Sequence, residues 1–373
     1  MANTRLPGLT AVALGALALC AALAAAQDTA ITANATTAVA GGERKHLFGG
    51  QYDPRSPAAE PAAVKPEWAG LIGTYGWEMA RFYVIEDDGE LKILAGWFDL
   101  ETLHPAPDGA FRTAASGPHG AQTITFQRDA TNQATGAEIG GVLYKRLPFD
   151  GPEQFFKIAP VRPVADLRRE ALASKPPVEA GSFRKPDLVE LNRLDDTIRL
   201  DIRYATDRNF LGAALYLQAR AYMERPAAEA VVRASHRLHE LGYGLLIHDA
   251  YRPWYVTRMF WVGVPPEKRG FVANPAKGSK HNRGCAVDLT LYRLKSGEPV
   301  RMTGGYDEMT ERSYPFYPGG TSSERWHRDL LRHAMEAEGF TVDGAEWWHF
   351  DLREWREYPI LNLTFEQLDS AKP

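Results

Sequence analysis

The second half of the chain is organised around the stretch Ser279–Asp288, which reads Ser-Lys-His-Asn-Arg-Gly-Cys-Ala-Val-Asp. It supplies an imidazole at His281 and a carboxylate at Asp288, with six residues between them. The run Ala286–Leu291 alternates its side chains with the period of a β-strand. Gly284 permits a tight turn before this strand, so that His281 can fold back towards Asp288. A nitrogen and a carboxylate oxygen suit zinc, whereas the alternative is a loop histidine and an aspartate bonded to nearby backbone.

A second imidazole and a second carboxylate lie far downstream in Glu346–Phe350, which reads Glu-Trp-Trp-His-Phe. Two histidines and one aspartate would leave the fourth position of zinc open for water, which is the catalytic rather than the structural pattern. Glu346 would then be the free base beside that water. Residues three apart point to opposite faces of a regular strand, so Glu346 and His349 can share a site only if a bend falls between them.

The composition is that of a globular protein with buried cores, because 45% of the 373 residues are hydrophobic and 9 are tryptophan. This length predicts two or three domains. The formal net charge is -4, and no basic stripe appears in the sequence. We therefore expect no nucleic-acid partner.

Residues 1–26 have the pattern of a signal peptide, because Arg5 is followed by an apolar run from Leu9 and three alanines precede Gln27. The alternative is a membrane anchor, but the apolar run is short, rich in alanine and ends in small residues. No other segment is apolar enough to span a bilayer. We expect an exported chain in the periplasm or cell envelope, without an integral membrane span after signal cleavage. Cleavage would also leave Cys285 as the single thiol, which excludes an internal disulfide.

Changes in composition along the chain predict four further segments. Residues 27–67 are rich in Ala, Thr, Gly and Pro and indicate a flexible tether. Residues 68–148 contain short strand-like runs, two of them joined by the hairpin signal Asp87-Asp88-Gly89, and predict a small antiparallel β accessory domain. Residues 149–186 are punctuated by proline and predict a connector, and residues 187–373 form the second domain. The accessory domain carries no cluster of histidines and carboxylates, so we expect binding or spacing from it rather than chemistry.

The second domain alternates predicted strands and helices. A strand is expected at Thr197–Tyr204, a helix opens at Pro226 and ends at Gly242, a buried strand covers Gly244–His248, and a later helix runs over Ser322–Glu338. With the two metal strands, the order is strand, helix, strand, metal strand, helix, metal strand. This order is typical of an α+β fold rather than of a doubly wound sheet.

Arg252 follows the buried strand directly, within the run Asp249–Pro253, which reads Asp-Ala-Tyr-Arg-Pro. An arginine at a strand end, fixed by the following proline, is suited to clamp an anion. The alternative is a surface arginine bonded to backbone. The run alone does not distinguish an anion clamp from a surface arginine, so residues elsewhere in the sequence are needed.

Several of these motifs, taken jointly, resemble the D-alanyl-D-alanine dipeptidases of the vancomycin-resistance type. The motifs are Tyr204–Gly212, Asp249–Pro253, Ser279–Asp288 and Glu346–Phe350. This family belongs to a wider group of zinc peptidases that includes peptidoglycan D-Ala-D-Ala carboxypeptidases and shares the Hedgehog-type fold. The resemblance spans about half of the chain, from Asp187 to Tyr358.

The resemblance implies a role for each matching residue. His281, Asp288 and His349 match the ligands of one zinc ion per chain. Glu346 matches the catalytic base, and Arg252 matches the arginine that stabilises the transition state. Residues that line the dipeptide site are matched by Tyr204, Ser279 and Asp307.

One loop departs from the family pattern. The family tends to have Met-Gly-x-x-Phe-Asp where Met302–Asp307 reads Met-Thr-Gly-Gly-Tyr-Asp. The glycine is shifted and the phenylalanine has become Tyr306, which affects the shape of the loop that would hold the amino end of the substrate. Cys285 also replaces a small residue, often serine, and we expect it to fill space rather than act as a nucleophile.

The function implied by the resemblance is zinc-dependent hydrolysis of the small dipeptide D-Ala-D-Ala to two D-alanines, in cell-wall turnover, D-alanine scavenging or glycopeptide resistance. One alternative is a peptidoglycan D,D-carboxypeptidase or endopeptidase of the same zinc group, against which a narrow site closed around a free amine would argue. Another is a non-catalytic zinc-containing binding module. The presence of both Glu346 and Arg252 argues against the binding module.

Overall fold

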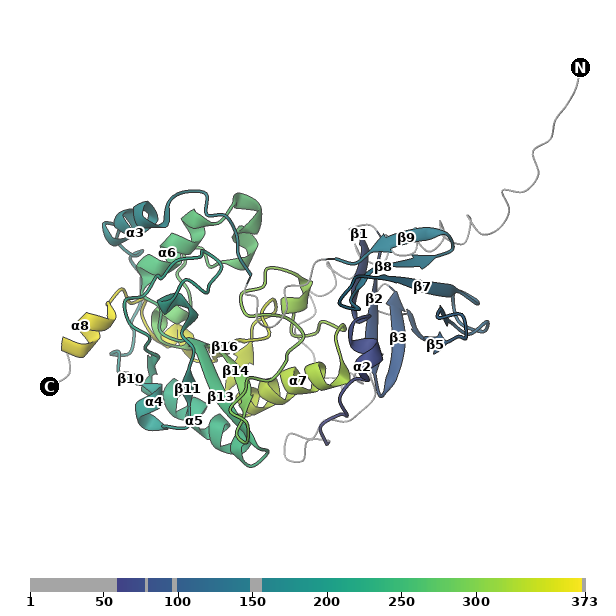
Figure 1. The fold of residues 1–373 in the computed structure, drawn as a ribbon. Helices are drawn as coiled ribbons and strands as arrows, with labels where there is room; N and C mark the ends of the chain where they lie inside the picture. Colours follow the sequence, from purple (N-terminus) through teal and green to yellow (C-terminus); the bar gives the residue numbers. More distant parts are fainter. Residues whose placement is uncertain (1–58, 78–79, 96–98, 148–155, 371–373) are drawn as a thin grey trace, which may run out of the picture. The chain divides into compact units, whose positions relative to one another are not determined.

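The computed structural model of this chain describes residues 59–77, 80–95, 99–147 and 156–370 (Figure 1). The predicted signal peptide, residues 1–26, lies outside the described residues, as does the predicted tether up to residue 58. The chain forms two compact units. Among the described residues, unit 1 comprises residues 59–147 together with Pro318–Arg325, and unit 2 comprises the rest of the chain from residue 156 onwards.

Unit 1 is built from two antiparallel sheets and a short helix, α2 (Pro66–Ala69). The first sheet has the strand order β1-β2-β3-β4, with β1 (Gly73–Trp77), β2 (Ala80–Asp87), β3 (Glu90–Ala95) and β4 (Asp99–Thr102). The second has the order β5-β6-β7-β8-β9, with β5 (His104–Pro105), β6 (Phe111–Arg112), β7 (Thr123–Arg128), β8 (Ala134–Ile139) and β9 (Val142–Lys145). The predicted hairpin is confirmed, because Asp87 pairs with Glu90 across a turn in which Asp88 and Gly89 have φ of 53° and 77°.

Pro318–Arg325 belongs to unit 1 and forms polar contacts with the end of β2. The Arg325 guanidinium donates to the Asp87 carboxylate at 3.0 Å and to the Glu86 carbonyl at 2.9 Å. The backbone N–H of Ser322 donates to the Glu86 carboxylate at 2.8 Å. The predicted second domain, residues 187–373, includes these residues. The helical pattern that starts at Ser322 is continuous and gives no local sign of a change of unit.

The central sheet of unit 2 has five strands in the order β11-β13-β14-β16-β15. Its strands are β11 (Arg199–Leu200), β13 (Tyr243–Asp249), β14 (Ala286–Arg293), β15 (Phe340–Val342) and β16 (His349–Leu352). β11 is parallel to β13, and the other pairs are antiparallel. A mixed sheet with helices agrees with the predicted α+β class.

The predicted strand Thr197–Tyr204 is much shorter in the structure. Only Arg199 and Leu200 pair with β13, and Arg203–Ala205 forms a 3-10 turn, η1. This turn carries the Tyr204 ring into the core, where it is 1% exposed. Tertiary packing of an aromatic ring thus overrides the alternating pattern.

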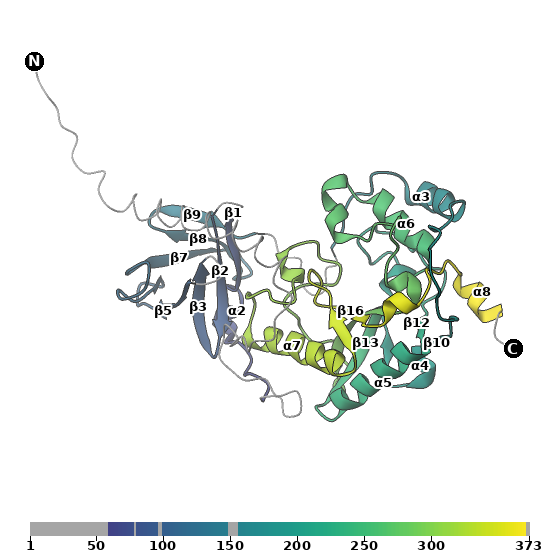
Figure 2. The same ribbon diagram turned by 180° about the vertical axis from the view of Figure 1, so that it is seen from behind.

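Figure 2 shows α5 (Arg225–His239) beside β13 and α3 (Val164–Leu172) against α6 (Trp254–Gly263). The two predicted helices are confirmed as α5 (Arg225–His239) and α7 (Ser322–Ala337). The remaining helices are α3 (Val164–Leu172), α4 (Leu191–Leu194), α6 (Trp254–Gly263) and α8 (Phe365–Ser370).

Two short strands, β10 (Leu188–Glu190) and β12 (Tyr222–Glu224), form a separate antiparallel pair. The 3-10 turns besides η1 are η2 (Pro266–Phe271), η3 (His281–Arg283), η4 (Glu311–Ser313) and η5 (Trp355–Glu357). Over the part of the chain that the structure describes, no helix has the length and hydropathy needed to cross a membrane.

Gly284 makes the turn between η3 and β14 possible. Its φ of 66° lies in the left-handed region, which favours glycine. A Cβ atom at this position would lie 2.5 Å from a methyl carbon of Leu188 and 3.1 Å from the backbone nitrogen of Glu224. A side chain here would therefore displace the turn that carries His281.

Candidate metal centre

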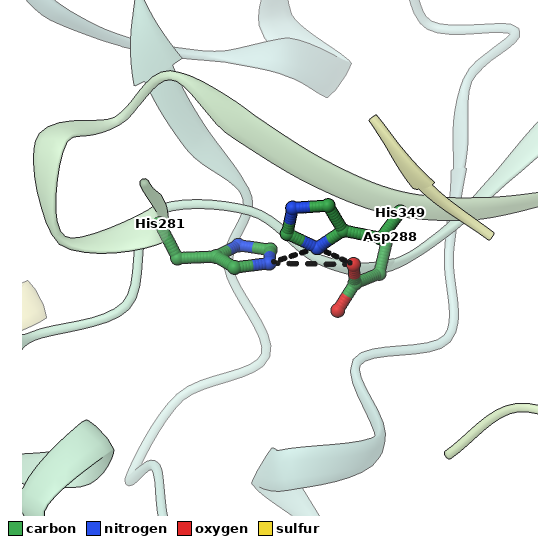
Figure 3. Close-up of side chains that lie close together, drawn as sticks. All are labelled: His281, Asp288 and His349. Atoms are coloured by element: carbon green, nitrogen blue, oxygen red, sulfur yellow. Dashed lines mark hydrogen bonds and ion pairs between the residues drawn. The ribbon is translucent and has the colours of Figure 1, made fainter. Parts of the chain in front are cut away.

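Three side chains from separate segments of unit 2 converge on one point (Figure 3). His281 comes from η3, Asp288 from β14, and His349 from β16, where it pairs directly with Asp288. His349 Nδ1 lies 3.0 Å from Asp288 Oδ1 and 3.1 Å from His281 Nε2, and His281 Nε2 lies 3.3 Å from the same Oδ1. The three residues are 1%, 2% and 7% exposed in sequence order.

In each imidazole, the nitrogen that faces away from Asp288 forms a hydrogen bond. This bond determines whether the nitrogen that faces Asp288 carries a proton or a lone pair. His281 Nδ1 donates to the Ala250 carbonyl at 2.6 Å, and His349 Nε2 donates to the Asp351 carboxylate at 2.8 Å. When both rings are neutral, the two inner nitrogens and Asp288 Oδ1 are all acceptors. Three acceptors this close repel one another unless a proton or a metal cation lies between them. Ligands about 2.0–2.1 Å from a tetrahedral zinc ion lie roughly 3.3 Å apart, so the donor set and its spacing fit zinc.

Asp288 is ionised in this setting although it is buried. Burial opposes its negative charge, but hydrogen bonds from His281 and His349, and the positive charge of these rings when no metal is bound and they are protonated, outweigh burial and hold the pKa of Asp288 well below the ordinary value. Its two oxygens have different neighbours. Oδ1 faces the imidazoles, whereas Oδ2 accepts from the Tyr306 hydroxyl at 3.0 Å and lies 3.7 Å from the Arg252 guanidinium.

Glu346 reaches the same site because the chain turns before β16. The backbone N–H of His349 donates to the Glu346 carbonyl, which provides the bend that the spacing requires. Glu346 Oε2 lies 3.7 Å from His349 Nδ1. Burial raises the pKa of Glu346 well above its ordinary value, against the opposing effect of His349. The carboxyl group is therefore suited to hold a proton.

Arg252 lies inside the site and not on the surface, since it is 7% exposed. Its guanidinium donates from Nε to Asp249 Oδ2 at 2.8 Å, and a second nitrogen lies 2.8 Å from the same oxygen. The other Asp249 oxygen accepts from the Tyr216 hydroxyl at 2.8 Å. Asp249 is not among the site residues predicted from the sequence. Its position three residues before Arg252 could have indicated an ion pair between the two side chains.

The three residues that the resemblance places in the dipeptide site line the same cavity as the metal centre; they are Tyr204, Ser279 and Asp307. The Tyr204 hydroxyl lies 2.9 Å and 3.1 Å from the two oxygens of Asp307. Burial, reinforced by the charge of Asp288, raises the pKa of Asp307 to about 8. Ser279 Oγ accepts a hydrogen bond from the backbone N–H of His281 at 3.3 Å.

One cavity of about 310 Å³ joins all of the residues that the sequence singled out. It is lined by Tyr204, Arg252, Ser279, His281, Asp288, Asp307, Glu346 and His349, among others. Phe210, Phe260 and Met309 add apolar surface to its wall. A cavity that combines apolar walls with a few convergent polar groups is suited to a small ligand.

Comparisons with known proteins cover this same region. A family model described as peptidase M15, D-Ala-D-Ala dipeptidase, matches residues 184–367. A curated D-alanyl-D-alanine dipeptidase of Escherichia coli (strain K12) is 35% identical over 179 residues, which cover 48% of this chain and 91% of that protein. Proteins with the same name from Enterococcus faecium and Streptomyces coelicolor are also 35% identical, over 47% and 45% of this chain and 95% and 92% of their own lengths.

A solved structure described as SurE with D-Leu covers 26% of this chain and 23% of its own, with 22% sequence identity and a TM-score of 0.20. This likeness is too small to establish a shared fold.

Proposed function

Because this chain belongs to the peptidase M15 family of D-Ala-D-Ala dipeptidases, we propose that unit 2 hydrolyses D-Ala-D-Ala to two D-alanines. One observation carries the proposal. The segment that matches nearly the whole length of the relatives is the segment in which the three candidate ligands, Glu346 and Arg252 line one cavity.

His281, Asp288 and His349 would hold a single zinc ion, which fits the nitrogen and oxygen donors and their spacing. When bound, zinc supplies a water of lowered pKa and polarises a carbonyl oxygen. Zinc dependence is general in this family of peptidases. The ligand side chains contribute by fixing the donor atoms in a buried setting.

Glu346 acts as the general base and then as the general acid. Its carboxylate accepts a proton from the attacking water and delivers it to the amine of the leaving D-alanine. One carboxyl group serves both steps, because it holds the proton between them. Arg252 stabilises the negative charge that develops on the scissile carbonyl oxygen. Asp249 holds the guanidinium in place for this role, with two contacts of 2.8 Å.

Asp307 and Tyr204 would receive the free ammonium of the dipeptide. The hydroxyl of Tyr204 already orients the Asp307 carboxyl group. An ammonium would pair with Asp307 and favour its ionised form. Ser279, on the same cavity wall as His281, would contact the substrate near the metal.

Incubation of the purified, zinc-loaded chain with free D-Ala-D-Ala and with L-Ala-L-Ala tests the proposal. We expect release of alanine from the D,D isomer and at least about tenfold slower release from the L,L isomer, since a shaped site discriminates by one or more kcal/mol. Cleavage of neither dipeptide by zinc-loaded protein would refute the proposed function. Preferential cleavage of a cell-wall pentapeptide would instead support a carboxypeptidase.

Three further proposals concern the chain as a whole. We propose that unit 2 has the Hedgehog-type fold of the wider zinc peptidase group. The signal pattern of residues 1–26 supports export to the periplasm or cell envelope, where the hydrolysis would serve cell-wall turnover, D-alanine scavenging or glycopeptide resistance. We assign binding or spacing to the β accessory domain, residues 68–148.

A further inference from the structure

An ion pair lies behind the candidate metal centre, on the side of His349 that faces away from the other two ligands. Asp351 uses one oxygen to accept from His349 Nε2 at 2.8 Å. Its other oxygen lies 2.7 Å from the ammonium of Lys280. Asp351 is buried, at 7% exposed, so its charge needs a partner.

The pair ties together the two segments that carry the histidines. Lys280 immediately precedes His281, and Asp351 stands two residues after His349 on β16. Residues two apart on a strand share a face, so Asp351 lies on the same face as His349. Asp288 lies directly opposite His349 in the sheet register and therefore shares this face as well.

Asp343 adds a second acidic side chain to this region. Together with His349 and Asp351 it forms a further group whose atoms are close enough to hold a metal ion. The ammonium of Lys280 lies 2.7 Å from Asp351 and 3.7 Å from Asp343. The ammonium of Lys280 therefore supplies the positive charge at this second group.

We propose that Asp351 and Lys280 are positioning residues for the metal centre. Asp351 holds the proton of His349 on Nε2 and so presents Nδ1 to the metal, and Lys280 balances the charge of Asp351. This inference rests on the proposed function only in requiring that the centre binds zinc.

The physical basis is the choice between the two nitrogens of a neutral imidazole. A hydrogen bond at one nitrogen fixes the proton there and leaves the lone pair on the other. Without Asp351, His349 could turn or exchange its proton between nitrogens, and the charge of Lys280, left with only the more distant Asp343, would repel a divalent cation. Both effects lower zinc affinity.

A double-mutant cycle separates the two effects. We expect Asp351→Asn, which removes the charge and keeps the shape, to weaken zinc binding about 10–100-fold, as loss of such outer partners does. Adding Lys280→Met to this variant removes the leftover positive charge, and we expect it to restore part of the affinity. Zinc dissociation constants from competition with a chelator provide the measurement.

Two further variants complete the design. Asp351→Glu keeps the charge but moves it, and we expect a smaller loss of affinity than with Asn. Asp187→Asn is the matched control, because Asp187 forms an exposed ion pair with Arg225 at 2.6 Å. We expect wild-type zinc affinity in that variant. Nitrogen NMR of the metal-free protein, recorded at a pH high enough for His349 to be neutral, should show the His349 proton on Nε2 in the wild type and a mixture of both tautomers in Asp351→Asn.

Wild-type zinc affinity and an unchanged His349 tautomer in Asp351→Asn would overturn this inference, whatever the turnover of that variant. Weakened zinc binding in Asp351→Asn, combined with a wild-type chain that cleaves no dipeptide, would instead support the inference and refute the proposed function. The two proposals can therefore fail separately.

Discussion

Two strands of eight residues, β2 in unit 1 and β14 in unit 2, bury carboxylates in different ways. Each is buried along nearly its whole length. β2 ends in Glu86 and Asp87, and β14 carries Asp288 as its third residue. Such burial is costly for a carboxylate unless its charge is met.

The partners of these carboxylates differ in kind. Asp87 contacts Lys92 at 2.8 Å and Arg325 at 3.0 Å, and Glu86 accepts backbone N–H groups. These donors are permanent, so the site is complete without any ligand. Asp288 faces imidazole nitrogens, which offer lone pairs when the rings are neutral. The chemistry of the partners, and not the extent of burial, separates a structural carboxylate from a candidate metal ligand.

The largest expected effect comes from removing an imidazole. We expect His281→Ala to lose stoichiometric zinc and to lower kcat/KM by more than the roughly 10²–10⁴-fold that a general base contributes, because the metal site itself is lost. Metal analysis and dipeptide turnover test this. Full zinc content together with normal activity would remove His281 from the centre.

Glu346→Gln should leave the metal in place and stop the chemistry. The amide keeps the shape of the side chain but cannot accept a proton, so we expect turnover to fall at least about a hundredfold while one zinc ion remains per chain. Turnover and metal content are measured on the same preparation. Near-normal turnover would show that another group is the base.

A dipeptide with a blocked amino group tests whether Asp307 binds the ammonium of the substrate. N-acetyl-D-Ala-D-Ala lacks the ammonium and should be cleaved about a hundredfold less efficiently than the free dipeptide, since a charged hydrogen bond contributes roughly 1.5–3 kcal/mol. Asp307→Ala should narrow this gap by harming the free dipeptide more than the blocked one. Equal kcat/KM for the two substrates in the wild type would instead favour a carboxypeptidase.

Arg252→Lys should lower kcat about tenfold or more with a smaller change in KM. Lysine keeps the charge but loses the planar fork that contacts Asp249, and the clamp acts on charge that appears in the transition state. Steady-state kinetics separate the two constants. A change in KM alone would identify Arg252 as a ground-state anchor.

The smallest effect on catalysis is expected from the carboxylate of β2. Asp87→Asn breaks the buried contact with Arg325 and should destabilise unit 1 by about 1–3 kcal/mol, while zinc affinity and kcat stay unchanged. Denaturant unfolding and zinc titration measure the two properties. The control is Asp88→Asn, because Asp88 is exposed and asparagine tolerates its φ of 53°. A loss of zinc in Asp87→Asn would show that the contrast between the two strands is false.

Part of this site follows from local pattern alone. The alternation after Gly284 predicts the strand that carries Asp288, and the hairpin and helix signals predict their elements because turn and capping chemistry acts within a few residues. The pairing of His281 with His349 needs residues 68 positions apart, and the sequence suggested it only through the resemblance of joint motifs.

The amino-acid order supplies the residue types of the site: the two imidazoles, the aspartate, the glutamate base and the arginine. Which of their atoms meet depends on how distant segments pack. The sheet register places Asp288 opposite His349, and contacts at Asp249, Tyr306 and Asp351 orient the side chains. The physical reason is that hydrogen-bond partners of buried polar groups come from whatever segment packs beside them, which no local periodicity encodes.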